Sequence, residues 1–374
     1  MFVYKILSLA ALVTACSGSL LRERFETWIN EFDIKLNNLE HKEHMFINWV
    51  ENDKHIENVN SMNATYTLGH NHFSGMNSVE FGEYMGFKQN VEIAKSERRY
   101  LRERLDEAKC LFGCSKDYDA EHKLDTIFCV SNCLQHKETN YFSLVQDIPS
   151  SINWVKDGAV TPVKNQGQCG SCWSFSTTGA LEGAYYVTYN ELPSLSEQQL
   201  VDCDNRQHGG KDMGCNGGLM DNAFNWIHKN GGLCSEKDYP YTSGTTRSAG
   251  TCETTCSNVA NTDIQKHTDV PSKSDESMMQ ALAQQPVSIA IQADQKDFQL
   301  YQSGVFTGSC GTQLDHGVLA VGYGTEDGVD YYLVKNSWGT TWGDKGYIKL
   351  GRGDEFNRGS GQCGLLLQAS YPSL

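Results

Sequence analysis

The sequence predicts an α+β fold of two lobes, a helical lobe followed by a sheet-rich lobe, after a mostly helical N-terminal segment. Two observations predict the lobes. Apolar residues recur at helical spacing between Cys172 and Asn230, whereas after about Asp263 short runs of β-branched and aromatic residues stand between Gly or Asp.

Residues 1–19 are expected to be a signal peptide. They contain one basic residue, Lys5, followed by the apolar run Ile6 to Ala15 and a cluster of small residues. The run is too short to cross a bilayer as a helix of the mature protein, so we expect no membrane attachment after its removal.

Residues 20–147 are expected to contain a long helix. Six residues recur at steps of three or four and would share one helix face: His41, Met45, Trp49, Asn52, Ile56 and Asn60. The helix is followed by Asn63-Ala64-Thr65, an acceptor sequence for N-linked glycosylation at Asn63.

A segment at about 90–135 carries four cysteines, in two pairs that would each lie at i and i+4 on a helix: Cys110 with Cys114 and Cys129 with Cys133. We expect a helical hairpin held by two disulfides, because disulfides form in an oxidising compartment. Zinc binding by the four thiolates is the alternative.

Three helices are expected in the first lobe. The stretch Cys172 to Tyr189 has no proline and carries apolar residues at helical spacing. Ser196 is a candidate N-cap for a second helix that ends near Cys203, and Asp221 to Asn230 would form a third.

Four short runs in the second lobe are expected to be strands, because they are rich in β-branched and aromatic residues and are bounded by turn residues. They are Pro286 to Ala293, Gly317 to Gly324, Asp330 to Lys335 and Gly346 to Leu350.

The composition fits an exported globular protein. At 374 residues and 39% hydrophobic residues, the chain can bury substantial cores. The formal net charge of −15 argues against nucleic acid or anionic membranes as partners, since both favour clustered Lys and Arg. We expect a monomer that needs no metal or other cofactor.

The stretch Lys164 to Phe175 brings together a candidate nucleophile, an oxyanion donor and a disulfide partner. A thiol attacks as its thiolate, and the N-terminus of a helix that begins near Cys172 would lower the pKa of the thiol. The motif Cys169 to Trp173, which reads Cys-Gly-Ser-Cys-Trp, is followed about 140 residues later by Leu314 to Gly317, and then by Asn336 to Gly339.

These motifs, in this order, resemble those of papain-like cysteine proteases, most closely the cathepsin L-like group. The resemblance covers most of the chain from Leu20 to Leu374 and implies a papain-like fold, in which a helical lobe carrying the cysteine faces a barrel-like lobe carrying the histidine. Residues 20–147 would be an inhibitory propeptide that acts on its own chain. Residues 148–374 would be the mature peptidase domain, released by cleavage near Asp147.

The motifs assign roles to five residues. Cys172 and His316 would form a thiolate and imidazolium pair, in which Cys172 attacks the peptide carbonyl and His316 protonates the leaving amine. Asn336 would orient the His316 ring, and Trp338 would shield that hydrogen bond from water. The Gln166 side-chain amide and the Cys172 backbone N–H would form the oxyanion hole.

The resemblance also implies the substrate-binding residues. By family position, the S2 pocket would be lined by Leu219, Met220, Ala290, Leu314, Gly317 and Gln368. Such a pocket implies a bulky hydrophobic P2 residue, and Gln368 would either bind a polar end of that residue or face solvent. Gly170, Gly217 and Gly218 would let the substrate backbone approach closely.

We expect an endopeptidase that acts on protein and peptide substrates, because no segment resembles the occluding loop or mini-chain of exopeptidase relatives. The alternative is a catalytically silent papain-fold binding or inhibitory protein. Such a protein has no need to keep Cys172, Gln166, His316 and Asn336 together.

Nine of the 14 cysteines follow residue 147, and an odd number leaves one thiol free when the others pair. The resemblance implies the pairs Cys169–Cys215, Cys203–Cys252 and Cys310–Cys363, which leaves Cys234 with Cys256. An exchange of Cys252 and Cys256 as the partner of Cys203 stays open. Disulfides and a signal peptide indicate the secretory pathway, with a lysosome, a vacuole or the extracellular space as the destination.

The propeptide departs from the family pattern at charged positions. His41 and Met45 replace an acidic and a basic residue, and Gly75 replaces an Asp in the motif Gly69 to Gly75. Histidines could take over the sensing of acid, and seven of the 11 lie in this region: His41, His44, His55, His70, His72, His122 and His136. Their protonation would loosen the propeptide; alternatively, they are only solvated polar residues.

Overall fold

The computed structural model describes residues 19–87 and 148–374. Three predictions lie outside the described residues: the signal peptide up to residue 18, the four-cysteine hairpin with His122 and His136, and the cleavage position near Asp147.

The N-terminal unit is helical, as the sequence predicts. It comprises a helix over residues 19–31, α2 (Leu39–Asn60), the short strand β1 (Tyr66–Leu68) and α3 (Ser78–Gly82). Asn38 caps α2 by accepting the backbone N–H of His41 at 2.8 Å. The first helix and α2 pack through a small core of Phe25, Trp28, Ile29, Met45 and Trp49.

Gly75 fits closely against this core. A Cβ at this position would lie 2.7 Å from Met45 and 2.8 Å from Trp28, so any side chain would collide with the two apolar residues. The neighbouring backbone is held by Asn52, whose amide donates to the carbonyls of Ser74 and Met76.

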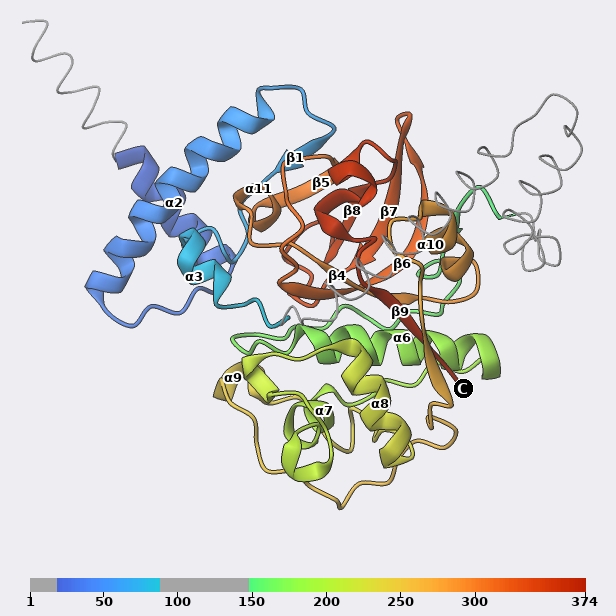
Figure 1. Ribbon diagram of the computed structural model, residues 1–374. Coiled ribbons are helices and arrows are strands. Elements are labelled where there is room, and N and C mark those ends of the chain that lie inside the picture. Colours follow the sequence, from blue (N-terminus) through green and yellow to red (C-terminus); the bar gives the residue numbers. More distant parts are fainter. Residues whose placement is uncertain (1–18, 88–147) are drawn as a thin grey trace, which may run out of the picture.

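The helical lobe follows residue 148. Its elements are α6 (Cys172–Tyr189), α7 (Glu197–Cys203), η1 (Arg206–His208), η2 (Gly214–Asn216), α8 (Met220–Asn230) and α9 (Ser243–Thr246). Ser196 caps α7 by accepting the Gln199 N–H, as predicted. In Figure 1, α6 lies between the sheet and the other helices of this lobe.

The sheet-rich lobe is an open, mostly antiparallel sheet in the order β1-β5-β8-β7-β6-β4-β9-β3, with β2 paired to β6. Its strands after β1 are β2 (Ile152–Asn153), β3 (Lys266–Asp269), β4 (Val287–Ile291), β5 (Tyr301–Phe306), β6 (His316–Glu326), β7 (Val329–Lys335), β8 (Tyr347–Gly351) and β9 (Ala369–Ser373). The connections contain α10 (Asp275–Leu282), α11 (Lys296–Gln299), η3 (Phe356–Gly359) and η4 (Gln362–Gly364).

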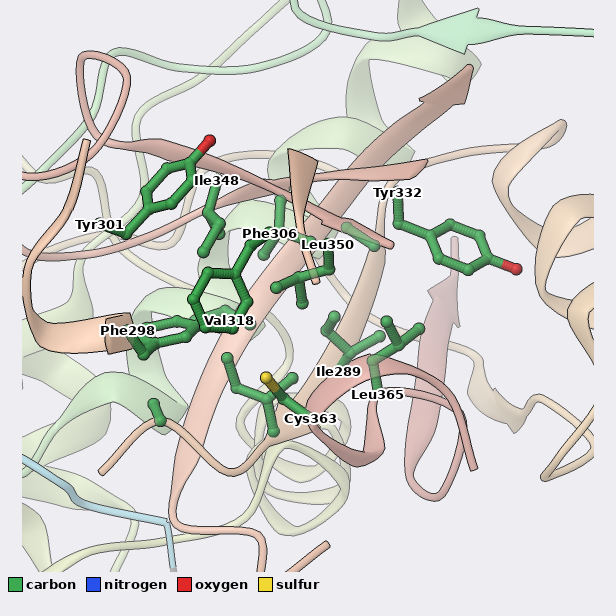
Figure 2. Packing of buried hydrophobic residues seen from close by; sticks show 14 of the residues in the cluster. Ile289, Phe298, Tyr301, Phe306, Val318, Tyr332, Ile348, Leu350, Cys363 and Leu365 are labelled. Carbon is green, nitrogen blue, oxygen red and sulfur yellow. The ribbon is translucent and has the colours of Figure 1, made fainter. Parts of the chain in front are cut away.

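Two cores correspond to the two lobes. In the sheet-rich lobe, side chains from α11, from β4 to β8 and from the η4 region interdigitate (Figure 2). The second core lies around α6, α7 and α8 and includes Trp173, Leu200 and Phe224. Because α6 packs on the sheet, Ser176 and Ser288 bond across the boundary between the lobes, with Ser288 Oγ donating to the Ser176 carbonyl at 2.9 Å.

The N-terminal unit extends the sheet. Strand β1 pairs antiparallel with β5, and Leu68, Phe73 and Phe81 join the core of the sheet-rich lobe. The segment from β1 to α3 is therefore part of the same packed structure as the catalytic domain in this form.

Four disulfides are present after residue 147: Cys169–Cys215, Cys203–Cys252, Cys234–Cys256 and Cys310–Cys363. Cys172 is the free cysteine among the described residues. No helix of the described ranges has both the length and the apolar character that a membrane crossing requires.

Candidate active site

Cys172 is the first residue of α6, just after the loop that the Cys169–Cys215 disulfide holds. Its side chain is fully buried, and the Gly317 N–H donates to its sulfur at 3.3 Å. Burial raises the pKa of the Cys172 thiol to about 11, and the backbone N–H groups of Gly317 and Gly86 offset only part of this rise. In this form the thiol is neutral.

His316 begins β6 and lies across from α6. Its Nε2 donates to the side-chain oxygen of Asn336 at 2.8 Å, and the same oxygen accepts the Ser337 N–H, which fixes the orientation of the amide. Trp338 stacks on the imidazole with ring centres 4.6 Å apart. Burial lowers the pKa of His316 to about 4, so the imidazole is also neutral.

The side-chain amide of Gln166 lies beside Cys172. Its Nε2 donates to the carbonyls of Tyr84 at 2.9 Å and Cys169 at 3.0 Å. Its Oε1 accepts the hydroxyl of Ser337 at 2.7 Å. Ser337, which the sequence analysis did not single out, therefore decides which end of the amide faces the site.

The N-terminal unit covers these residues with the segment 84–87. The backbone N–H of Gly86 bonds to the Cys172 sulfur, and the Gly86 carbonyl accepts the Gly218 N–H at 3.0 Å. A Cβ at Gly86 would overlap the Gly170 backbone, so only glycine allows this approach. Phe87 forms a parallel bridge with Gly218 and donates its N–H to the Asp315 carbonyl at 2.9 Å.

Phe87 is buried together with residues that the sequence analysis assigned to the S2 pocket. It is 6% exposed and belongs to the same apolar cluster as four predicted pocket residues, Leu219, Met220, Ala290 and Leu314. Gly317 borders this cluster, because a Cβ there would lie 3.1 Å from the Met220 sulfur.

Gln368 and Leu367 are neighbours in the sequence, but only Leu367 belongs to this apolar cluster. Gln368 is outside the cluster and partly exposed, and its carbonyl accepts the Ala290 N–H. Leu367 is in the cluster, although the sequence analysis did not name it. The run of leucines just before Gln368 is the sequence feature from which Leu367 could have been predicted as a pocket residue.

Aromatic residues pack around Trp338 on the side of the site away from Cys172. Phe73 and Phe81 pack edge-on against Trp338, with ring centres 5.2 Å and 5.3 Å away, and Trp342 adds a third edge at 5.0 Å. The N-terminal unit therefore occupies both the cleft and the surface beside it.

A buried charge cluster supports the loop that carries Gln166. Lys164 contacts Glu197 of α7 at 2.6 Å and Glu182 of α6 at 3.2 Å, and both carboxylates are buried. Burial alone would lower the pKa of Lys164, but the two carboxylates raise it above its ordinary value, so Lys164 stays charged. Lys335 of β7 lies nearby, with its Nζ donating to Thr161 at 3.0 Å.

Comparison with known proteins identifies this arrangement. The family model described as papain family cysteine protease matches residues 148–373, and the model of the cathepsin propeptide inhibitor domain matches residues 25–81. The chain belongs to the papain family of cysteine proteases.

Similar papain-family proteins include Cysteine protease XCP2 of Arabidopsis thaliana, which is 40% identical over 96% of this chain and 87% of its own length. The KDEL-tailed cysteine endopeptidase CEP2 of the same plant is 38% identical, over 98% of this chain and 92% of its own.

Among solved structures, the proform of the ragweed pollen protease Amb a 11 matches with a TM-score of 0.73 and 32% identity over 95% of this chain and 94% of its own. The recombinant stem bromelain precursor matches with a TM-score of 0.72 and 33% identity over 95% and 99%.

Membership of the papain family explains the covered cleft. The chain is a cysteine endopeptidase made as a zymogen, and residues 25–81 belong to a propeptide that inhibits the protease in the same chain. The match to papain-like proforms also confirms the predicted fold class, with the sheet open rather than closed into a barrel.

One group of side chains in the described ranges is close enough to share a metal ion: Asp221, His267 and Asp269. Asp269 is exposed and the other two are partly exposed. Ser370 donates to Asp221 at 2.6 Å, so this group already takes part in a hydrogen bond of the protein. It lies on α8 and β3 and is no part of the cleft described above.

Proposed function

We propose that Cys172 is the nucleophile of this endopeptidase and His316 its general acid and base, with Asn336 as the positioning residue of the imidazole and Gln166 as an oxyanion donor. The observation that carries this proposal is the Tyr84 carbonyl. It accepts a hydrogen bond from Gln166 Nε2 beside Cys172, where the carbonyl oxygen of a substrate would lie during attack.

The reaction begins when the propeptide leaves the cleft. Water and substrate then reach Cys172 and His316, and a proton moves from sulfur to imidazole. The thiolate attacks the carbonyl carbon, and the Gln166 amide and the Cys172 N–H stabilise the oxyanion. His316 protonates the leaving amine; the acyl-enzyme is then hydrolysed by a water molecule that gives its proton to His316.

We infer a preference for a bulky hydrophobic P2 residue. Phe87 of the propeptide supports it, because it is buried and belongs to the same apolar cluster as Leu219, Met220, Ala290, Leu314 and Leu367. A P2 phenylalanine or leucine would replace this ring without leaving a cavity. Gln368 lies outside the apolar cluster and does not oppose such a side chain.

We further infer that the mature enzyme begins near Ile148 and that the protein follows the secretory route. The papain-family match starts at residue 148, and four disulfides are typical of an oxidising compartment. Asn63 lies in an exposed turn with φ 54° just after α2, where a glycan would meet no packed surface.

The test uses the full-length precursor, activated in acid with a thiol reductant, beside a Cys172→Ser precursor. Fluorogenic peptides carry Phe, Leu, Ala or Lys at P2. We expect at least tenfold higher kcat/KM for Phe or Leu than for Ala, and no activity in the Cys172→Ser protein. Activity in that variant would overturn the assignment of the nucleophile, and equal cleavage of the Ala peptide would overturn the P2 preference.

A further inference from the structure

The loop that carries Gln166 is backed by α9. The Gly244 carbonyl accepts the Gln168 N–H at 3.0 Å, and Tyr241 donates its hydroxyl to the Gln166 carbonyl at 2.8 Å. A Cβ at Gly244 would lie 2.8 Å from that carbonyl, so the two backbones are in close contact. The beginning of α9 thus lies directly against the oxyanion-hole loop.

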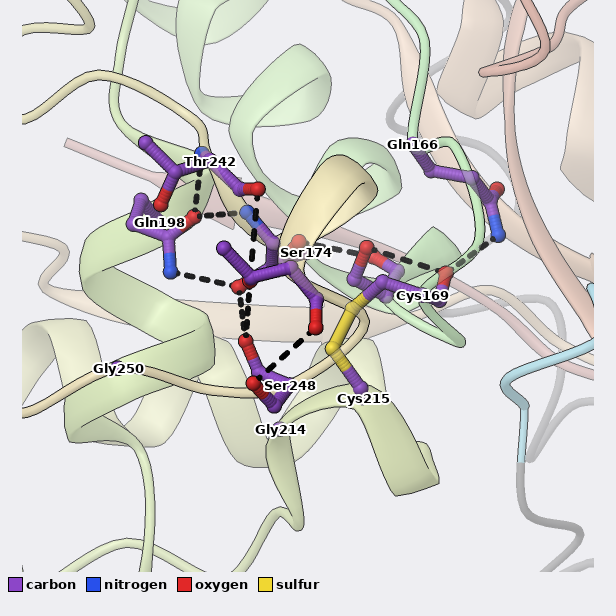
Figure 3. The surroundings of a disulfide bond; sticks show 12 residues. Gln166, Cys169, Ser174, Gln198, Gly214, Cys215, Thr242, Ser248 and Gly250 are labelled. Atoms are coloured by element: carbon purple, nitrogen blue, oxygen red, sulfur yellow. Dashed lines mark hydrogen bonds between the residues drawn. A yellow bond between two sulfur atoms is a disulfide. The ribbon is translucent and has the colours of Figure 1, made fainter. Parts of the chain in front are cut away.

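Buried hydrogen bonds hold α9 in place. The side-chain oxygen of Gln198 accepts the N–H groups of Thr242 and Ser243, and its Nε2 donates to the Ser243 hydroxyl at 2.7 Å. Figure 3 shows this network beside the Cys169–Cys215 disulfide. These bonds therefore also define the position of Arg247, the residue that follows α9.

Arg247 has left-handed backbone angles (φ 59°, ψ 22°), and its N–H donates to the Ser243 carbonyl at 2.8 Å. The side chain is exposed and makes no ion pair or hydrogen bond with any residue of the described ranges. Arg247 is thus a cation beside the cleft without an ion-pair partner in residues 19–87 and 148–374, in a chain with a net charge of −15.

In the zymogen, Arg247 faces an acidic surface. A cavity of about 380 Å³ separates the propeptide from the catalytic domain, which contributes Gln168 and Arg247 to its lining. The propeptide contributes Glu80, Glu83 and Tyr84, together with His41 and apolar residues. Burial raises the pKa of Tyr84, and the charge of Arg247 opposes the rise, so the guanidinium acts on this part of the propeptide.

The position of Tyr84 locates Arg247 relative to the scissile bond. Phe87 is buried with the predicted S2 residues and Gly86 lies against Cys172, so Tyr84 lies beyond Cys172, on the side of the leaving group. Tyr84 is in the turn that follows α3, with its N–H bonded to the Phe81 carbonyl, and its own carbonyl accepts the Gln166 amide, where the scissile carbonyl oxygen would lie. The cavity beside Tyr84 therefore lies next to the scissile bond, on its primed side.

We propose that Arg247 is a specificity-determining residue that favours Asp or Glu on the primed side of the scissile bond, at P1′ or P2′ of the substrate. The inference rests on the proposed catalytic and S2 residues. An exposed cation attracts a carboxylate modestly, and the attraction is screened by salt. Once the propeptide leaves, a carboxylate of the substrate occupies the position opposite Arg247 where Glu80 and Glu83 lie in the zymogen.

The experiment compares internally quenched peptides with Leu at P2 and Glu, Gln or Lys either at P1′ or at P2′, cleaved by the mature enzyme obtained from the full-length precursor. The pH is kept above about 5.5 so that glutamate is ionised. We expect kcat/KM about two- to fivefold higher for the Glu peptide than for the Gln peptide at low salt, and a smaller ratio at high salt.

Arg247→Gln should bring the Glu to Gln ratio close to one, and Arg247→Lys should keep most of it. Arg206→Gln, which removes an exposed cation of η1, should leave the ratio as in the wild type. A general folding defect would slow both peptides alike and leave their ratio unchanged.

A peptide with Leu at P2 and a fluorophore as leaving group reports the proposed function separately. If it is hydrolysed and the wild-type ratio is close to one, or if the ratio survives in Arg247→Gln, the inference about Arg247 is wrong. If no peptide is hydrolysed, both the proposed active site and the inference fail.

Discussion

At the scale of single residues, latency has an electrostatic cause as well as a steric one. The zymogen buries Cys172 and His316 completely, and this burial raises the pKa of the thiol to about 11 and lowers the pKa of the imidazole to about 4. Both shifts favour the neutral form, whereas the reaction needs the charged pair. Removal of the propeptide returns water to both groups at once.

Gln166 provides the first prediction. Gln166→Ala should lower kcat by about a hundredfold, because one of two oxyanion donors is lost. Ser337→Ala should lower it by about three- to tenfold, since the amide loses the bond that orients it. Rates are measured per active site by titration with an irreversible thiol inhibitor.

The matched control for these variants is Gln285→Ala, whose amide bonds to the Pro372 carbonyl away from the cleft. We expect kcat in this variant to stay within about twofold of the wild type. An equal loss of kcat in Gln285→Ala would show that the effect is structural and not a loss of oxyanion stabilisation.

At the scale of elements, periodicity and caps predict the regular structure well. The helix from Cys172 to Tyr189 is found with both ends correct, the cap at Ser196 is confirmed, and each of the four expected strands has a counterpart in β4, β6, β7 or β8. These elements have continuous local patterns, so the sequence contains the information that defines them.

Helix α10 was missed although it has a local pattern, with Ser274 as its N-cap. Three other missed elements lack such patterns. Strand β5 contains Gly304 at φ 83° and is completed by pairing with β1, and β9 contains Pro372. Helix α9 has four residues and is fixed by Gln198, which lies 44 residues before Thr242. Contacts between distant segments also place Tyr84 and Phe87 in the cleft, and no local pattern of theirs could reveal it.

The hypothesis that histidines of the propeptide sense acid can be examined for His70 and His72. His72 bonds to Thr341 of the catalytic domain at 3.0 Å, and burial lowers the pKa of His72 to about 4. His70 stacks on Trp49 and bonds to Asp53 at 3.0 Å; burial lowers its pKa, and Asp53 offsets only part of the change. Neither histidine is a freely solvated residue.

The sign of the effect follows from these shifts. A released His72 takes up a proton near pH 6.5, whereas the docked one does so only near pH 4, so docking weakens as the pH falls from 6.5 toward 4. Replacing His72 with Asn should therefore keep the precursor latent to a lower pH. The midpoint of activation is measured by following both size and activity in a pH series.

A His72→Asn precursor with the wild-type midpoint would contradict this mechanism. His41→Asn is the control, because the ring of this partly exposed histidine accepts the Asn37 N–H just before α2 and, unlike His72, makes no hydrogen bond to a described residue of the catalytic domain. A shift of the same size in both variants would indicate a general loss of propeptide stability.

At the scale of the whole molecule, the two lobes and the propeptide form one packed unit. Phe87 belongs to the core of the helical lobe, whereas Phe73 and Phe81 belong to that of the sheet-rich lobe. The propeptide thus bridges both lobes, and the Lys164 cluster connects the oxyanion loop with α6 and α7 beneath it.

Lys164→Ala should destabilise the precursor by about 3 kcal/mol or more, because it leaves two buried carboxylates without their cation. The free energy of unfolding is measured by urea denaturation in the Cys172→Ser background. Lys35→Ala, which breaks an exposed pair with Asp33, should cost less than about 0.5 kcal/mol. Equal losses would mean that burial of the Lys164 cluster has no energetic consequence.

The burial of Cys172 also determines how readily oxidants react with its thiol. Residues 148–374 contain four disulfides and one free thiol, so the mature enzyme works only where the thiol stays reduced while the disulfides stay oxidised. In the zymogen the thiol is neutral and shielded from solvent, and sulfenic acid formation requires an accessible thiolate. Hydrogen peroxide should therefore inactivate the mature enzyme quickly, whereas a precursor treated first and activated later should keep its activity. The propeptide then serves as a store of reduced enzyme in an oxidising environment.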